Sequence, residues 1–221
     1  MRTFKNLPKG PKTALIAFLV GSVITIAVQV GYELFLERHE MPTELVGIVL
    51  PKPRGVASFQ LLDHNGQTFN LERLQGKWTF MFFGYTHCPD VCPTTMGLLS
   101  DVFKRLKERH PQALAQSQGI FVSIDPKRDT KAVLKDFVPY FNQEFLGITG
   151  DEEQIQKFAK GLGVGFKLSE PEKDGSYAIS HTSAIYLMDP RGRFYALFQS
   201  QFHDADRIAD MFPKIIDFNS K

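Results

Sequence analysis

The chain has few cysteines: its 221 residues contain only Cys88 and Cys92. Two cysteines cannot build the dense disulfide framework of small secreted domains, so a hydrophobic core must hold the fold. The sequence also lacks a run or stripe of basic residues, and after residue 12 it has 22 basic against 24 acidic residues. A slightly acidic domain of this kind argues against nucleic-acid binding. Internal repeats and low-complexity tracts are absent as well.

Charge is missing from residues 13–32, a run of 20 residues that would be about 30 Å long as a helix, close to the thickness of a bilayer core. Four basic residues precede this run and three acidic residues follow it: Arg2, Lys5, Lys9 and Lys12, then Glu33, Glu37 and Glu40. The positive-inside rule then predicts a cytoplasmic N-terminus at 1–12, a single transmembrane anchor at 13–32 and an exported remainder. A cleaved signal peptide is the alternative, but no Ala-x-Ala pattern closes the run.

Pro42, Pro51 and Pro53 lie in a mixed segment, 33–55, which we interpret as a tether to a folded domain of residues 56–221. In that domain the apolar pattern predicts a hairpin around residues 63–66, followed by alternating strands and helices. The expected elements are strands at 78–83, 120–124 and 145–149, helices at 93–109, 130–141 and 151 to about 162, a hairpin of 183–188 with 194–198, and a helix at 204–216. This order favours an α/β fold with a central mixed sheet flanked by helices.

Both cysteines lie in the turn between the strand at 78–83 and the helix at 93–109. Backbone N–H groups at a helix start favour negative charge, so a thiolate forms there more readily than in a free peptide. Because Cys88 and Cys92 are four residues apart, a helical turn puts both sulfurs on one face, close enough to chelate a metal or to form a disulfide. Cysteines at the first strand-to-helix turn of the core are typical of a thioredoxin-like fold. A purely structural disulfide would close too short a loop to stabilise the chain much.

A third ligand would complete a trigonal site, because two thiolates suit Cu(I) and an added imidazole would also allow Cu(II). His181 ends a polar loop at 167–180 and precedes an apolar strand, a place where a scaffold presents functional groups. Its position alone leaves a generic surface histidine as an equal alternative. His87 adjoins Cys88 but would point elsewhere in a helical turn. The other four histidines are expected to face solvent: His39, His64, His110 and His203.

Three aspartates near these motifs have structural explanations. Asp129 is expected to be the N-cap of the helix at 130–141, and Asp125 to form a turn with the proline that follows it. Asp90 could hydrogen-bond near the thiolates or support the turn. None of the three is therefore counted among the metal ligands.

Three segments, in this order, match the signatures of one known family: GYTHCPDVCP at 84–93, SIDPKRDT at 123–130, and His181-Thr182 before a strand. On these motifs the chain resembles the Sco/SenC group of membrane-anchored, thioredoxin-like copper chaperones, over roughly residues 56–218. The resemblance implies that Cys88, Cys92 and His181 bind copper as Cu(I), Cu(II) or both. It assigns no catalytic residue beyond that redox-active cysteine pair. Members often carry Asp where this chain has Ser180, so the sequence does not identify the residue that hydrogen-bonds the His181 ring.

The resemblance also implies a cellular role. Similar proteins help to load the binuclear copper centre of cytochrome c oxidase subunit II, by passing copper, by reducing that subunit's cysteines, or both. The expected partners are subunit II, an upstream periplasmic copper donor and the membrane, through the N-terminal helix. The expected location is a bacterial inner membrane, crossed once, with the soluble domain in the periplasm.

Two other functions would use the same cysteines. One is a periplasmic thiol–disulfide oxidoreductase with no role in copper delivery. The other is a peroxidase, which fails on detail because Pro89 and Tyr85 stand where peroxiredoxins carry Thr and Pro. A metallochaperone without turnover is favoured over an enzyme, and thiol–disulfide reductase activity stays open beside it.

Overall fold

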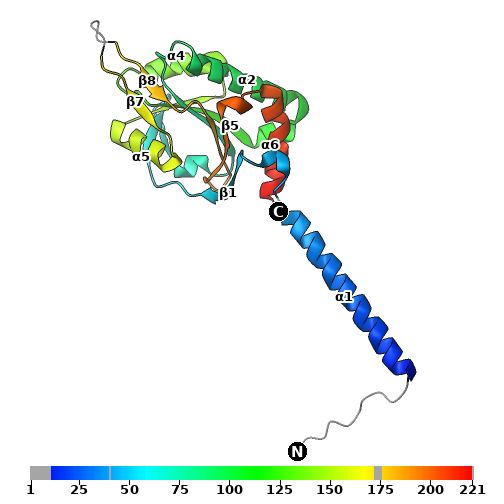
Figure 1. Cartoon of the computed structure of the whole chain (residues 1–221). Coiled ribbons are helices and arrows are strands. Elements are labelled where there is room, and N and C mark those ends of the chain that lie inside the picture. The colour runs from blue at the N-terminus through cyan, green and yellow to red at the C-terminus, as the bar shows by residue number, and fades with distance from the viewer. Residues whose placement is uncertain (1–10, 40, 172–175, 221) are drawn as a thin grey trace, which may run out of the picture. The chain divides into compact units, whose positions relative to one another are not determined.

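The structure is a computed structural model that describes residues 11–39, 41–171 and 176–220 (Figure 1). It divides into two compact units, one of residues 1–43 with 221 and one of Glu44–Ser220, and we describe each by itself. Residues 1–10 of the expected basic N-terminus lie outside the described residues, as does Glu40.

The first unit contains one long helix, α1 (Pro11–His39), in its described residues. The expected anchor at 13–32 falls inside this helix, and the stretch Ala14–Tyr32 has a mean hydropathy of 2.2. The hydroxyl groups of Ser22 and Thr25 donate to carbonyl oxygens one turn earlier, both at 2.9 Å, so they need no outside partner. By length and composition, this helix can cross a membrane.

The second unit is built on an eight-stranded sheet in the order β1-β10-β9-β4-β5-β6-β2-β3. Strands β4, β5 and β6 are parallel to one another, and the other neighbours are antiparallel. The strands are β1 (Val49–Arg54), β2 (Gln60–Asp63), β3 (Thr68–Asn70), β4 (Trp78–Gly84), β5 (Ser117–Ser123), β6 (Leu146–Thr149), β9 (Ile185–Met188) and β10 (Phe194–Phe198). A separate pair consists of β7 (Phe166–Leu168) and β8 (Ile179–His181). The mixed central sheet is thus confirmed.

Helices lie on both faces of this sheet. The α-helices are α2 (Val91–Arg109), α3 (Pro111–Ala115), α4 (Lys131–Phe141), α5 (Glu152–Leu162) and α6 (Ala205–Asn219), and short 3-10 helices are η1 (Thr43–Leu45), η2 (Leu71–Leu74) and η3 (Ser200–Phe202). Phe80 of β4 packs against Phe103 of α2 and Phe212 of α6. On the other face of β4, Phe83 packs against Phe158 of α5, and Figure 1 shows α5 and α6 on opposite sides of the sheet. Because β4 is buried along its whole length, its end is a rigid base for the loop that follows.

The expected tether at 33–55 differs from the structure. Helix α1 continues to His39, and strand β1 pairs with β10 at the edge of the main sheet. The second unit therefore begins at Glu44 rather than at residue 56. Pro51 and Pro53 favoured a loop interpretation, but proline is tolerated in an edge strand, where one row of backbone groups has no ladder partner. Leu45, Ile48 and Val49, just before and at the start of β1, are buried.

A histidine joins the strands at the other side of the sheet. The backbone N–H of His64 donates to the carbonyl oxygen of Gly147 at 2.8 Å, and His64 Nδ1 accepts from the Gly147 N–H at 3.0 Å. The ring must therefore be unprotonated at Nδ1. Burial lowers the pKa of His64; nearby Asp63 opposes this shift and Lys135 adds to it.

Acid should destabilise the domain partly through this ring. With a folded-state pKa below that of the unfolded chain, His64 contributes stability above the unfolded value, and this stability is lost as the pH falls. We expect His64→Asn, which keeps an acceptor near the Nδ1 position but does not titrate, to lose less unfolding free energy between about pH 7 and pH 5. Chemical denaturation of both proteins across this range measures the slopes. His181 and His203 contribute equally to both, so identical slopes would contradict the prediction.

Candidate metal centre

The cysteine loop connects the end of β4 to the start of α2. The N–H of Cys88 donates to the carbonyl oxygen of Tyr85 at 3.2 Å, which closes a turn, and Cys92 lies in the first turn of α2. Asp90 supports this turn, because one of its carboxylate oxygens accepts from the Thr94 hydroxyl at 3.3 Å. Gly84 lies below the loop, where an added Cβ atom would come within 2.9 Å of Cys92 Sγ.

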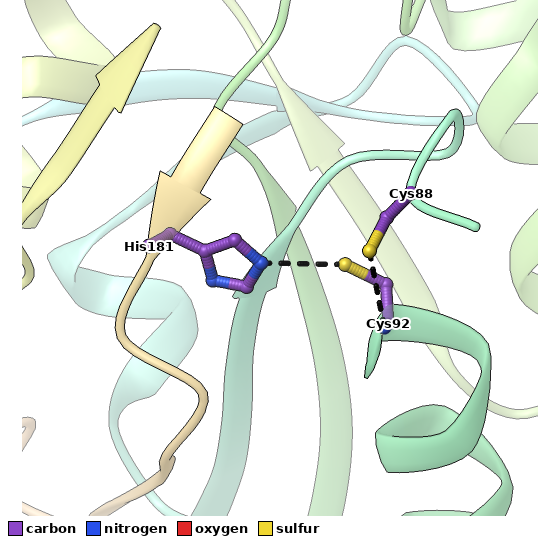
Figure 2. A group of neighbouring side chains, drawn as sticks. All are labelled: Cys88, Cys92 and His181. Carbon is purple, nitrogen blue, oxygen red and sulfur yellow. Dashed lines mark hydrogen bonds between the residues drawn. The ribbon is translucent and has the colours of Figure 1, made fainter. Parts of the chain in front are cut away.

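The structure brings Cys88, Cys92 and His181 together from two parts of the chain, as Figure 2 shows. Cys92 Sγ lies 3.4 Å from His181 Nε2, and the Cys92 N–H donates to Cys88 Sγ at 3.4 Å. One ligand atom from each of the three residues lies within 4.8 Å of the other two. Both cysteines are free thiols. This is the group that the sequence motifs implied.

The two thiols have different surroundings. Cys88 is half-buried: burial opposes its ionisation, but hydrogen bonds from Cys92, Asp90 and Val91 outweigh burial and lower the pKa of Cys88. Cys92 has no exposed surface. Burial raises the pKa of its thiol strongly, and the neighbouring Cys88 adds to that rise.

This asymmetry predicts which of the two thiols reacts first. With the chain reduced and free of metal, iodoacetamide should alkylate Cys88 first, because the thiolate is the nucleophile and Cys92 is inaccessible. Peptide mass analysis at short times measures which residue carries the label. Labelling of Cys92 ahead of Cys88 would contradict this arrangement.

His181 is oriented by the backbone of the residue that follows it and by two aromatic rings. Its Nδ1 lies 3.1 Å from the carbonyl oxygen of Thr182; since a carbonyl only accepts, Nδ1 carries the hydrogen and Nε2 is free to act as a ligand. The rings of Phe82 and Tyr85 contact it edge-on, at 5.9 and 6.1 Å between centroids. Burial lowers the pKa of His181, which favours the neutral, ligating form. Ser180, the residue that departs from the family pattern, is exposed, and the group that contacts His181 Nδ1 is the Thr182 carbonyl oxygen.

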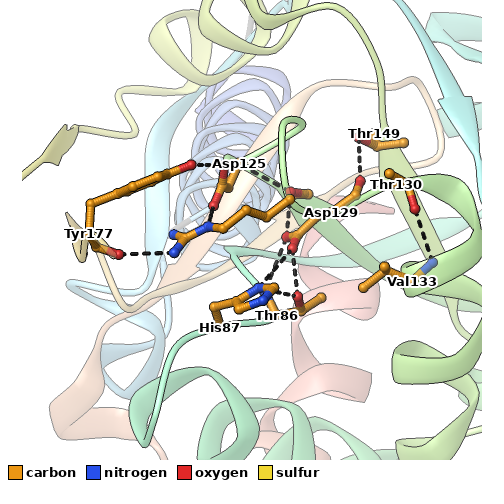
Figure 3. Close-up of polar contacts among 10 residues, drawn as sticks. Thr86, His87, Asp125, Asp129, Thr130, Val133, Thr149 and Tyr177 are labelled. Atoms are coloured by element: carbon orange, nitrogen blue, oxygen red, sulfur yellow. Dashed lines mark hydrogen bonds and ion pairs between the residues drawn. The ribbon is translucent and has the colours of Figure 1, made fainter. Parts of the chain in front are cut away.

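The other histidines with described side chains are engaged elsewhere. His87 Nδ1 lies 3.1 Å from the Thr86 hydroxyl and 3.9 Å from Asp129 Oδ1 (Figure 3), and His87 is not part of the group of Cys88, Cys92 and His181. His64 binds Gly147 as described above. His110 and His203 contact Asp210 and the Phe198 carbonyl oxygen, and the side chain of His39 lies outside the described part.

Asp129 has a different role from the expected N-cap. The cap of α4 is Thr130, whose hydroxyl accepts from the Val133 N–H at 3.3 Å. The buried Asp129 carboxylate instead accepts from the Thr86 N–H at 3.0 Å, the Thr86 hydroxyl at 2.6 Å and the Ser123 hydroxyl at 2.7 Å. Burial raises the pKa of Asp129, and these hydrogen bonds partly oppose the rise. Asp129 thus ties the loop at 123–130 to the cysteine loop (Figure 3).

The expected polar loop at 167–180 also differs from the structure at its two ends. Its ends form the antiparallel strands β7 and β8, with Phe166 opposite His181 and Leu168 opposite Ile179. Sequence analysis missed this pairing because both strands are three residues long and one is largely exposed. It also missed Tyr177, which contacts residues about fifty positions away and carries no local signal.

The donor set suits a soft metal ion. Two sulfurs and one imidazole nitrogen match the preferences of Cu(I), and the nitrogen extends the set toward Cu(II). Zinc normally takes a fourth ligand. The fold and the site together define a thioredoxin-like domain with a Cys-Cys-His group that could hold a metal ion.

The sequence profile of the SCO1/SenC family matches residues 50–217, and the chain belongs to that family. A putative copper-binding protein of Stutzerimonas stutzeri is 33% identical over 184 residues, which cover 83% of this chain and 88% of that protein. The mitochondrial SCO2 homologue of Bos taurus is 36% identical over 156 residues, 71% of this chain and 58% of that protein.

Solved structures agree with this assignment. Bradyrhizobium japonicum ScoI with copper bound is 37% identical, with a TM-score of 0.65 and coverage of 73% of this chain and 99% of that chain. Arabidopsis thaliana ScoI with copper bound is 30% identical, with a TM-score of 0.67 and coverage of 75% and 99%. The fold is therefore the thioredoxin-like fold of the Sco proteins.

Proposed function

We propose that this chain binds one copper ion through Cys88, Cys92 and His181 and serves the assembly of cytochrome c oxidase. The observation that carries the proposal is the cluster of two sulfurs and one imidazole nitrogen, all within 4.8 Å of one another. Relatives described as copper-binding, and neighbours solved with copper bound, support it. In this role the cysteines hold the ion as cargo, and the neutral His181 Nε2 completes a trigonal set.

The finer role that we propose concerns subunit II of the oxidase. The chain delivers copper to the binuclear copper centre of subunit II, keeps the thiols of that centre reduced, or does both. It receives its copper from an upstream periplasmic donor. Family membership supports a role in oxidase assembly, and the half-buried Cys88 offers a side from which a partner ligand can approach.

A copper competition experiment tests the proposal. The reduced full chain in detergent is titrated with Cu(I) in competition with a coloured chelator, beside the His181→Ala variant. The expected result is one ion per chain, with weaker binding in the variant because one of three ligands is gone. A chain that cannot compete for Cu(I) would overturn the copper assignment.

A second candidate function is thiol–disulfide exchange, favoured by the half-buried, more acidic Cys88 next to the fully buried Cys92. Here the Cys88 thiolate attacks a partner disulfide and releases one partner thiolate. The Cys92 thiol then loses its proton and displaces the second partner sulfur, so two electrons pass to the partner and a Cys88–Cys92 disulfide remains. A chain that reduces subunit II but does not bind Cu(I) would favour this function alone.

We also propose that α1 anchors the chain in a bacterial inner membrane with the folded domain in the periplasm. The hydropathy of Ala14–Tyr32 and the basic residues before it support this orientation. A membrane-impermeant maleimide added to intact spheroplasts of an expressing bacterium should label the accessible Cys88 of the reduced chain. Labelling only after the cells are lysed would place the domain on the cytoplasmic side.

A further inference from the structure

The loop at 123–130 lies between the two halves of the metal centre. On one side, Asp129 binds the backbone and side chain of Thr86 in the cysteine loop. On the other side, Asp125 and Arg128 bind Tyr177, four residues before His181 (Figure 3). Adjacent residues of one short loop thus contact both segments that supply metal ligands.

The contacts with Tyr177 are numerous. Arg128 Nη1 donates to the carbonyl oxygen of Tyr177 at 3.0 Å, and its guanidinium carbon lies 3.7 Å from the centroid of the Tyr177 ring. The Tyr177 hydroxyl donates to Asp125 Oδ1 at 2.8 Å, while Arg128 Nε donates to the other oxygen of the same carboxylate. Charge-assisted hydrogen bonds and a stacked guanidinium are among the stronger side-chain contacts.

Tyr85 continues this contact toward the metal centre. The Arg128 guanidinium lies 5.5 Å from the Tyr85 ring centroid, and the Tyr85 ring contacts His181 edge-on. The Tyr85 hydroxyl also accepts from the Ile179 N–H at 3.3 Å. Contacts from Tyr85 and from the loop at 123–130 therefore hold three alternate residues in and just before β8: Tyr177, Ile179 and His181.

Strand β8 needs such contacts because it lies outside the main sheet. In the described residues it pairs only with β7, a strand three residues long. A further backbone bond, from the Thr182 N–H to the Gly165 carbonyl oxygen at 3.2 Å, also ties this segment to the β7 side. No ladder of the eight-stranded sheet thus fixes the height or rotation of His181 relative to the sulfurs.

We propose that Arg128 and Tyr177 form a latch that positions His181 against Cys88 and Cys92. Both are positioning residues: they hold the backbone that carries the ligand and do not contact the ion. The consequence for copper rests on the proposed function, whereas the consequence for the backbone of β8 does not.

A double-mutant cycle tests the latch in the reduced full chain. Arg128→Gln should weaken Cu(I) binding by about 10–100-fold, the usual effect of removing a group behind a metal ligand. In a His181→Ala background the same change should cost nothing more, because no ligand is left to position. Equal losses in both backgrounds, or no loss in the parent chain, would overturn the latch.

Amide hydrogen exchange of the metal-free chain gives a second readout. We expect the Ile179 amide to exchange at least about tenfold faster in Arg128→Gln, with an intermediate effect in Tyr177→Phe, which loses only the hydroxyl. Arg193→Gln is the matched control: Arg193 is 31% exposed and pairs with the buried Asp189, much as Arg128 is 22% exposed and pairs with Asp125. The Arg193–Asp189 pair lies in the β9–β10 turn, and its loss should leave Ile179 unchanged.

These readouts separate the two proposals. If the parent chain binds no Cu(I), the proposed function fails, yet faster exchange at Ile179 in Arg128→Gln alone still supports the latch. Unchanged exchange at Ile179 in Arg128→Gln overturns the latch, even if copper binding is intact.

Discussion

Replacing Cys92 with alanine is expected to lower the Cu(I) affinity of the full chain by more than about a hundredfold. Even the loss of a residue that only hydrogen-bonds a metal ligand lowers metal affinity by about 10–100-fold. Cys92 Sγ is the central donor of the site: it lies beside His181 Nε2, and the Cys92 N–H binds the other sulfur. Competition with a coloured chelator under reducing conditions measures the loss.

Two further variants sharpen this result. Cys88→Ala should lose copper to a similar degree, but only Cys92→Ala should also lose stability, on the order of 1 kcal/mol, because its side chain is fully buried. Thr94→Ala, in the same helical turn, removes an exposed hydroxyl whose hydrogen bond in the described part of the chain is to Asp90. The affinity should be unchanged, because the Thr94 N–H still donates to the Asp90 carbonyl oxygen at 3.1 Å and keeps the turn closed. Tight Cu(I) binding by Cys92→Ala would sink the proposed ligand set.

The second large effect is expected from Gly84→Ala, a change of one methyl group. The new Cβ atom would lie 2.9 Å from Cys92 Sγ and 3.0 Å from ring atoms of Phe121 and Phe82. These neighbours are buried in the core, so the crowding should lower the unfolding free energy by about 1–3 kcal/mol. The Cys92 sulfur must also move, so copper binding should weaken together with stability.

Gly97→Ala is the matched control for this substitution. Gly97 lies inside α2, and no neighbouring heavy atom comes within 4 Å of its added Cβ atom beyond the helix's own backbone. Alanine there should stabilise the helix by about 0.5–1 kcal/mol and leave copper binding alone. Chemical denaturation and chelator competition follow both variants. A Gly84→Ala protein as stable and as tight-binding as its parent would contradict the close contact at Gly84.

Much of the fold could be predicted from local sequence patterns. The fully apolar strand β4, the four-residue spacing of Cys88 and Cys92, and the turn residues of both hairpins all act over short stretches of chain, where periodicity and turn chemistry are informative. The same is true of Asp204, which caps α6 by accepting from the Arg207 N–H. These elements place the cysteine loop at the end of the central strand.

The second half of the site could not be derived in this way. His181 lies 89 residues from Cys92, and without the resemblance to a family its place at the end of a polar loop left a generic surface histidine as an equal alternative. The latch depends on side chains 49 and 52 residues apart, which only the folded chain brings together. Asp129 was misassigned because an acidic residue before a helix satisfies the capping pattern as well as Thr130 does.

The separation of β8 from the eight-stranded sheet also bears on timing. Local opening needs less free energy than global unfolding where few backbone bonds and little buried surface are involved, and the β7–β8 pair meets both conditions. We therefore expect the segment that carries His181 to open locally, once the contacts of the Arg128–Tyr177 latch are broken, while the main sheet stays intact. Under the proposed function, the release of copper would then depend on this local opening rather than on the stability of the whole domain.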